Sequence, residues 1–189
     1  MTKKFDPAKA ERLIAPERYM ELKPDVLLQR LAIPPGKTIL DVGCGNGFFT
    51  FPAAAAMGDG MVIAADASEH MLALLEDRDP PDNVQILKVD EVDMDVDTDS
   101  VDAVVALFVF HEFKDPVANF EAFTRVLRSD GKILLLDWDP AAERERGPAH
   151  THRKPAESAV EVLNKTGFKV LEQELYTEDI WLIIAQRKA

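Results

Sequence analysis

Short apolar runs alternate with helix-forming segments five times along this chain, and this alternation restricts the fold more than any other feature of the sequence. The apolar runs, each with the length and aliphatic content of a buried strand, lie at 38–42, 61–65, 84–87, 101–108 and 132–138. Helical patterning is found at 24–31, 48–57, 68–75, 115–127 and 155–166. Because parallel strands are joined by crossover helices, the order predicts a doubly wound α/β sheet with helices on both faces.

The C-terminal residues depart from this alternation. Two further apolar runs, 168–175 and 180–185, are separated only by Thr177-Glu178-Asp179, which predicts an antiparallel hairpin. The sheet is therefore expected to have seven strands, mostly parallel, with an antiparallel strand at its C-terminal edge. No internal repeat or linker divides the chain, so we predict a single domain over 1–189, with a helical lid over 1–33 and the core over 34–189.

Charge and cysteine content exclude several classes of function. The formal net charge of −12 opposes binding to nucleic acid and to anionic lipid surfaces. The single cysteine excludes an internal disulfide and a cysteine-rich metal site. The N-terminal residues Met1 to Pro7 lack the apolar core of a signal peptide, and no apolar run approaches the length of a membrane span. We therefore expect a cytoplasmic protein without a membrane span, whose oligomeric state the sequence leaves open.

A glycine-rich loop, Asp41-Val42-Gly43-Cys44-Gly45-Asn46-Gly47, follows the first predicted strand and opens a helix. Such a loop lets a ligand lie against bare main chain beside a helix N-terminus. A dinucleotide fingerprint would require glycine where Phe48 stands, and Asp41 would repel a diphosphate. The same carboxylate would favour a ligand that carries a sulfonium and an ammonium group.

Acidic residues end the next two strands. Asp66 closes the second strand about twenty residues after the loop, where a carboxylate can accept both ribose hydroxyls. It can equally act as an acid at a helix N-terminus. Asp90 ends the third strand and is placed to take an adenine amino group, with the Glu91 amide beside the ring.

These residues resemble the class I S-adenosylmethionine-dependent methyltransferases, which have a Rossmann-like fold. Within that class the resemblance is to the methyltransferase type 11 group, which includes the ubiquinone/menaquinone-biosynthesis C-methyltransferases, and it extends from about Phe5 to Gly167. ILDVGCGNGFFT at 39–50 is similar to the family's first motif, and LFVFHEF at 107–113 to the segment that faces the reacting methyl group. RVLRSDG at 125–131 is similar to the family's RVLKPGG turn, with Ser-Asp in place of Pro-Gly.

The resemblance implies S-adenosyl-L-methionine as cofactor and S-adenosyl-L-homocysteine as product. It places the methionine part of the cofactor on the glycine loop, the ribose on Asp66 and the adenine beside Met71 and Asp90. The expected cofactor-binding residues are Asp41, Gly43, Cys44, Gly45, Gly47, Asp66, Ala67, Met71, Asp90, Glu91, Leu107 and Phe108.

The acceptor side is expected just beyond the fourth and fifth strands. His111 is the candidate catalytic base, with a purely structural histidine as the alternative. Trp138 is expected to contact the acceptor or to belong to the core. Arg18, in the N-terminal segment, and Arg153, on the long polar loop 139–154, are candidates for binding an acidic acceptor. The histidine spacing does not suggest a metal site, so no metal is expected.

These observations favour methyl transfer to a small molecule. The Asn/Asp-Pro-Pro-aromatic signature of amino-directed base methylation is absent after the fourth strand, and a metalloid acceptor would require more cysteines. Two alternatives stay open: an NAD(P)-binding oxidoreductase and a non-catalytic regulator that binds S-adenosylmethionine. The sequence does not identify the acceptor atom.

Overall fold

A seven-stranded sheet forms the centre of the molecule, with the order β3-β2-β1-β4-β5-β7-β6. The structure is a computed structural model and describes residues 7–90, 92, 94–144 and 146–188. The strands are β1 (Thr38–Val42), β2 (Met61–Asp66), β3 (Val84–Lys88), β4 (Val101–Leu107), β5 (Leu127–Trp138), β6 (Phe168–Thr177) and β7 (Ile180–Arg187). Strands β1 to β5 are parallel, whereas β7 runs antiparallel to both β5 and β6. This confirms the predicted doubly wound α/β fold with its antiparallel C-terminal hairpin.

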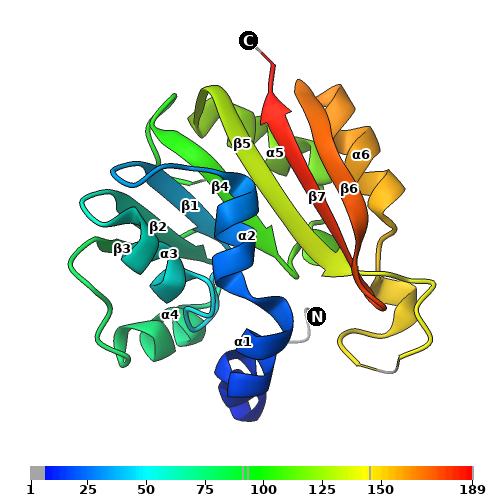
Figure 1. Cartoon of the computed structure of the whole chain (residues 1–189), viewed down its shortest axis with the longest axis horizontal. Helices are drawn as coiled ribbons and strands as arrows, with labels where there is room; N and C mark the ends of the chain where they lie inside the picture. The colour runs from blue at the N-terminus through cyan, green and yellow to red at the C-terminus, as the bar shows by residue number, and fades with distance from the viewer. Residues whose placement is uncertain (1–6, 91, 93, 145, 189) are drawn as a thin grey trace.

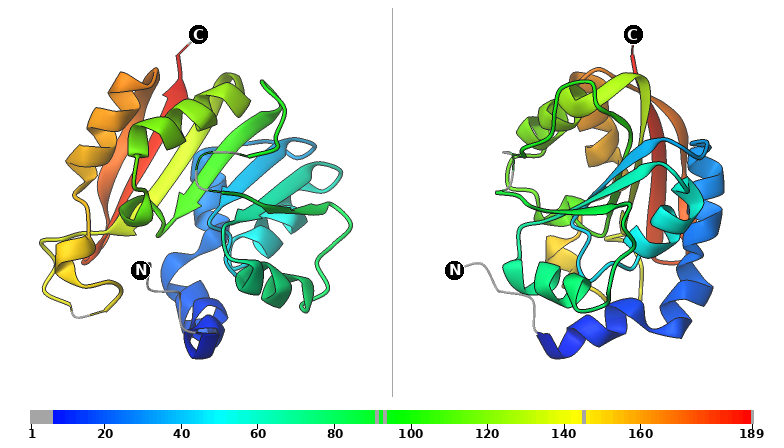
Figure 2. Two further views of the ribbon diagram at one scale, coloured as in Figure 1. Left: turned by 180° about the vertical axis from the view of Figure 1, so that it is seen from behind. Right: turned by 90° about the vertical axis from the view of Figure 1, so that its left-hand side faces the viewer.

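Helices cover both faces of the sheet (Figures 1 and 2). They are η1 (Pro7–Ile14), α1 (Pro16–Leu22), α2 (Pro24–Leu31), α3 (Thr50–Met57), α4 (Glu69–Glu76), η2 (Phe110–Glu112), α5 (Pro116–Val126), η3 (His150–His152) and α6 (Ala156–Lys165). Apolar residues of α2 and α3 pack with alternate residues of β1, β4, β5 and β7 on one face. Those of α5 and α6 pack on the other face with the remaining residues of the same strands. Two apolar layers therefore enclose the sheet, as parallel strands require.

Helix starts follow the signals in the sequence. The Ser68 side chain accepts a hydrogen bond from the Met71 amide at 3.3 Å, which caps α4. Asp115 caps α5 in the same way, accepting from the Ala118 amide at 3.1 Å, and Pro116 occupies the first turn.

Two elements begin two or more residues away from the position expected from the sequence. Strand β5 begins at Leu127 instead of Lys132, because the predicted turn at 129–131 is a bulge within the strand: Val101 pairs with Leu127, and Ala103 next pairs with Lys132. Asp130 in that bulge has φ 66°, so a residue of the predicted turn has a left-handed backbone conformation although it lies within the strand. Helix α3 begins at Thr50 instead of Phe48, since the glycine loop continues in turns to that point.

The segment expected to be a lid divides into two parts. Helix α2 belongs to the core layer: Leu27 and Leu31 are fully buried, and Lys132 Nζ donates to the Leu31 carbonyl at 2.9 Å. By contrast, η1 and α1 lie at the edge of the sheet where the parallel strands end, together with α4 and the loop after β5 (lower edge in Figure 1). Strand order reverses between β1 and β4, and ligands of such sheets bind at the carboxyl ends beside that reversal. Within the described ranges, no helix combines the length and the apolar character required to cross a membrane.

Candidate active site

The glycine loop after β1 packs tightly against two neighbouring segments. A Cβ added at Gly43 would lie 2.9 Å from Val109 Cγ2, and one at Gly45 would lie 3.3 Å from Met71 Cε. Gly45 has φ 55°, a conformation that side chains disfavour. The loop therefore offers bare backbone between the end of β4 and α4, as a cofactor cradle requires.

Asp66 joins this loop to the start of α4. Its Oδ2 accepts a hydrogen bond from the Gly45 amide at 2.8 Å, and its Oδ1 accepts from the Ser68 amide at 2.8 Å. Burial raises the pKa of Asp66, an effect that these amides partly offset. Asp66 therefore lies beside Gly45 and next to Ser68, the N-cap of α4, a position compatible with both roles that the sequence left open.

Asp41 is a second carboxylate at the same place. Its side chain is buried at the end of β1 and accepts a hydrogen bond from Thr50 Oγ1 at 2.7 Å. Burial, together with the nearby Asp66 charge, raises the pKa of Asp41 to about 7. Among the residues that the structure describes, no lysine, arginine or histidine forms an ion pair with either carboxylate. A buried and a half-buried carboxylate without a cation fit a cationic ligand.

The other expected cofactor residues have different surroundings. Met71 is buried against Gly45, Ala67 is exposed, and Cys44 is buried, with a thiol pKa raised by burial. Asp90 is exposed and lies two residues beyond the end of β3, the strand that pairs with β2, which ends at Asp66. Glu91 lies outside the described residues.

Leu107 and Phe108 are half-buried at the end of β4, and the Phe108 amide donates to the Leu136 carbonyl at 2.7 Å. Both therefore lie beside the glycine loop, since β1 and β4 are adjacent.

His111 is held by a carboxylate that the sequence analysis did not single out. Its Nδ1 lies 2.8 Å from Asp137 Oδ1, and its backbone amide donates to Asp137 Oδ2 at 2.9 Å. Asp137 is buried at the end of β5, where its Oδ1 also accepts from the Trp138 amide at 2.7 Å. Since a carboxylate only accepts, Nδ1 carries the proton, and the other ring nitrogen, Nε2, lies 3.8 Å from Glu112 Oε1. The signal for Asp137 was present in the sequence, as an acid in the otherwise apolar strand ILLLDW.

Trp138 borders an aromatic cluster at the same edge. Its ring centroid lies 4.9 Å from that of Phe108, and the Arg18 guanidinium carbon lies 4.7 Å from the Phe108 ring centre and 5.0 Å from that of Phe48. Phe48 follows the glycine loop, so the cluster connects the ends of β1, β4 and β5. The structure thus brings Arg18 and Trp138 together at the edge predicted for the acceptor.

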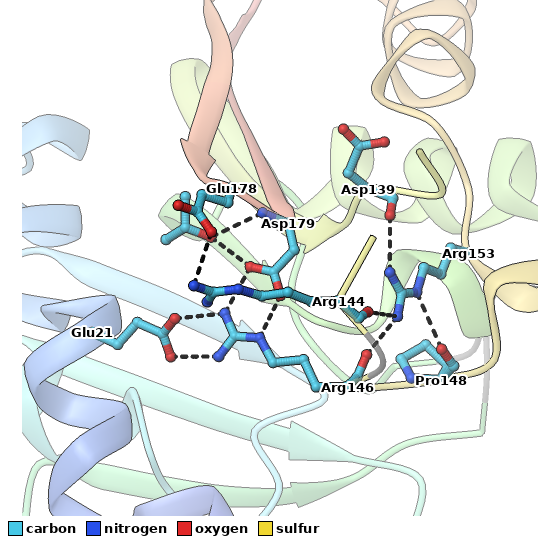
Figure 3. A network of polar contacts seen from close by, with 9 residues as sticks. Glu21, Asp139, Arg144, Arg146, Pro148, Arg153, Glu178 and Asp179 are labelled. Carbon is cyan, nitrogen blue, oxygen red and sulfur yellow. Dashed lines mark hydrogen bonds and ion pairs between the residues drawn. The ribbon is translucent and has the colours of Figure 1, made fainter. Parts of the chain in front are cut away.

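Arg153 has a different environment from the one expected. Its guanidinium is buried and donates to four backbone carbonyls: those of Pro148, Asp139, Arg144 and Arg146 (Figure 3). These bonds shape the loop 139–154 and leave few donors for a ligand. The geometry favours a structural role for Arg153, and a contact with the acceptor stays an untested prediction.

Comparison with known proteins identifies the family. The sequence model of the family described as "Methyltransferase domain" matches residues 40–135. A solved S-adenosylmethionine-dependent methyltransferase from Aquifex aeolicus has a TM-score of 0.90 and 27% identity, covering 97% of this chain and 99% of that one. A probable S-adenosylmethionine-dependent methyltransferase of Mycolicibacterium smegmatis is 30% identical over 175 residues, which are 87% of this chain and 66% of that protein.

Other relatives differ in what they methylate. The tRNA (carboxymethyluridine(34)-5-O)-methyltransferase of Mus musculus is 30% identical over 117 residues, covering 60% of this chain but 16% of that protein. The chain spans less than two thirds of the length of the curated relatives it matches. The family model covers more than half of the chain and includes the glycine loop with its carboxylates. The chain therefore belongs to the class I S-adenosylmethionine-dependent methyltransferases, a family whose cofactor is S-adenosylmethionine.

Proposed function

We propose that this protein transfers a methyl group from S-adenosylmethionine to a small-molecule acceptor, and that His111 removes a proton from that acceptor. The observation that carries the proposal is the pairing of His111 with Asp137 at the carboxyl edge of the sheet. His111 follows β4, which is adjacent to β1 and its glycine loop, and Asp137 lies at the end of β5, which is adjacent to β4. The cofactor carries the transferred methyl group on a sulfonium. The thioether that leaves when this methyl group is transferred needs no help from the protein. The protein therefore contributes mainly alignment, worth about 7–11 kcal/mol in favourable cases, and a base where the acceptor must lose a proton.

The residues around the glycine loop fit the two ends of the cofactor. We propose that main-chain groups of Gly43 to Gly47 hold the methionine part and that Asp41 provides negative charge for its cationic groups. Asp66 would accept hydrogen bonds from the ribose hydroxyls, in addition to the hydrogen bond that its Oδ2 accepts from the Gly45 amide. Met71 and Asp90 would flank the adenine, together with Glu91.

His111 has the environment of a positioned base. Its side chain is 10% exposed, and Asp137 fixes both its ring orientation and the proton on Nδ1. Nε2 can then accept a proton from an O–H, N–H or activated C–H group of the acceptor. Asp137 is a positioning residue in this scheme, because it acts through His111 and has no access to the acceptor from its buried place at the end of β5.

A small acceptor is favoured over RNA by charge and by the shape of the edge. A net charge of −12 opposes a polyanion, and the aromatic rings of Phe48, Phe108 and Trp138 form a compact apolar border. We further propose that η1 and α1 act as the lid over this border, since Asn46 of the loop donates to the Ala10 carbonyl at 2.7 Å.

Methyl transfer can be tested directly. The protein is incubated with methyl-labelled S-adenosylmethionine and either a panel of small phenols, amines and carbonyl compounds or total tRNA. Label in a small molecule is expected, with a rate that falls about 10²–10⁴-fold in His111→Ala. Label in tRNA alone would contradict the small-molecule acceptor.

Calorimetry separates the two alternative functions. Binding of NADH but not of S-adenosylmethionine would indicate an oxidoreductase. Tight S-adenosylmethionine binding without label transfer to any acceptor would favour a non-catalytic regulator.

A further inference from the structure

Three arginines surround the aromatic cluster of Phe48, Phe108 and Trp138. The guanidinium of Arg18 lies over Phe48 and Phe108, while those of Arg146 and Arg153 lie 5.4 and 5.7 Å from the Trp138 ring centre. In a chain of net charge −12, such a concentration of cations at one edge needs a reason. The three differ in what their donors bind, and that difference identifies their roles.

Arg146 and Arg153 are fully engaged by the protein. Arg146 donates to both carboxylate oxygens of Glu21, at 2.5 and 2.7 Å, and to both of Asp179 (Figure 3). Arg153 is bound to backbone carbonyls of its own loop. Their charges and donors are therefore used for structure.

Arg18 is the exception. Within the described part of the chain its guanidinium has no hydrogen-bond or ion-pair partner, and its Nε is buried without one. Glu21 follows it by one turn of α1, but both oxygens of that carboxylate are taken by Arg146. Burial lowers the pKa of Arg18 to about 10, and the nearby Arg146 charge adds to this, while Glu21 and Tyr19 oppose it. A half-buried cation whose Nε is buried without a partner is costly, so a ligand that supplies an anion gains affinity there.

We propose that the methyl acceptor carries an anionic group, a carboxylate or a phosphate, and that Arg18 binds this group between Phe48 and Phe108. The inference rests on the proposed function and adds the class of acceptor to it. Arginine suits the task because its planar guanidinium binds either anion in a bidentate manner. Phe108 and His111 belong to the same short segment after β4, so the anion site and the base flank one strand end. The acceptor is thus a small molecule with an anionic end on Arg18 and a methylated group near His111.

The methionine carboxylate of the cofactor is the other possible source of such an anion, and the experiment distinguishes the two. The full chain, saturated with S-adenosylhomocysteine, is titrated calorimetrically with benzoate, phenyl phosphate and the neutral benzamide. Separately, S-adenosylhomocysteine and 5′-methylthioadenosine, which lacks the amino-acid part, are titrated into the free protein. Each titration is repeated with Arg18→Gln and with the control Arg128→Gln, which removes a half-exposed arginine at the opposite edge of the sheet.

We expect at least one anionic probe to bind ten times more tightly than benzamide, and Arg18→Gln to remove that advantage. S-adenosylhomocysteine affinity should change by less than threefold, and Arg128→Gln should behave as the unchanged protein does. The preferred probe identifies the anion as carboxylate or phosphate. Equal binding of anion and amide, no detectable anion binding, or an unchanged anion affinity in Arg18→Gln would each overturn the proposal.

A tenfold loss of S-adenosylhomocysteine affinity in Arg18→Gln, with methylthioadenosine unaffected, would also overturn the proposal, by assigning Arg18 to the cofactor carboxylate. Failure of the proposed function has a different signature, since the unchanged protein would then transfer labelled methyl groups to no small molecule, whatever Arg18→Gln does to the anion affinity.

A second variant keeps the test independent of how Arg18→Gln folds. Arg18→Lys retains the charge but not the bidentate geometry, and should give an intermediate anion affinity. An anion affinity that both Arg18→Lys and Arg18→Gln leave unchanged would show that the anion binds away from Arg18.

Discussion

Replacement of Asp41 by asparagine tests whether the site is built for a cation. The carboxylate is 2% exposed, and its pKa is raised from a usual 3.8 to about 7 by burial and by Asp66. A group whose pKa is raised on folding contributes stability below its unfolded pKa and loses it as the pH rises through the folded pKa. The loss therefore occurs between about pH 4 and pH 7. One pKa unit corresponds to about 1.4 kcal/mol, so the full loss above pH 7 is about 4 kcal/mol.

Asp41→Asn keeps a side-chain oxygen that accepts from Thr50 and has no charge to lose. We expect the variant to lie within about 1 kcal/mol of the unchanged protein in free energy of unfolding near pH 4.5 and to exceed it by about 4 kcal/mol at pH 8. Urea unfolding followed by fluorescence of Trp138 and Trp181, both buried, provides the measurement. Thr50→Val is the matched control: it removes the hydroxyl that lowers the pKa of Asp41, so it should destabilise the protein most at high pH.

The same variant should bind S-adenosylmethionine more weakly, because the cation that compensates Asp41 then has no partner. In the unchanged protein, the cofactor affinity should rise between pH 6 and pH 8 as Asp41 ionises. A difference in stability between the two proteins that is independent of pH would refute the reasoning, since it would give Asp41 an ordinary pKa.

Three further predictions, on five substitutions, test the parts of the site separately. Asp66→Ala should weaken S-adenosylmethionine binding at least tenfold, about 1.4 kcal/mol, whereas Ser68→Ala, which removes only the helix cap, should leave calorimetric affinity within threefold; equal effects would make Asp66 a cap as well. His111→Ala and Asp137→Asn should both lower turnover with little change in cofactor affinity, and a steady-state pH profile altered by only one of them would separate the pair. Gly45→Val should abolish cofactor binding, because φ 55° disfavours a side chain and the new Cβ would lie 3.3 Å from Met71 Cε, so that the added methyl groups occupy the bare backbone surface expected to hold the ligand; a folded variant with normal affinity would exclude the loop from the site.

The fold was predictable because its signals are local and periodic. Apolar runs, the caps at Ser68 and Asp115 and the turn at 177–179 specify which segments are strands and helices and where the C-terminal hairpin lies. The boundary of β5 was predicted wrongly at Lys132, because turn residues at 129–131 are also compatible with a bulge. No local pattern distinguishes these two arrangements, and the pairing with β4 decides between them.

The site was less predictable, since its contacts join residues far apart in the chain. The partnership of His111 with Asp137 spans two strands, and a lone acid in a strand does not reveal which side chain it will hold. Arg18 and Arg153 looked equivalent in the sequence, yet one donates to four carbonyls and the other has an unpartnered Nε among the described residues. Such differences depend on the packing of α1 and of the loop 139–154 and have no counterpart in composition or spacing.

The bidentate contacts of Arg146 have a mechanical consequence for the entrance of the site. One guanidinium joins Glu21 of α1 to Asp179 at the turn between β6 and β7, and Arg146 itself lies on the loop after β5 (Figure 3). Opening α1 away from the sheet must therefore break the Arg146–Glu21 ion pair, one of the two that Arg146 forms from this loop. Backbone amides of α1 and of the loop should exchange with deuterium at correlated rates, and high salt should accelerate both together. Entry of the acceptor and release of the product would then be controlled by a single shared opening step.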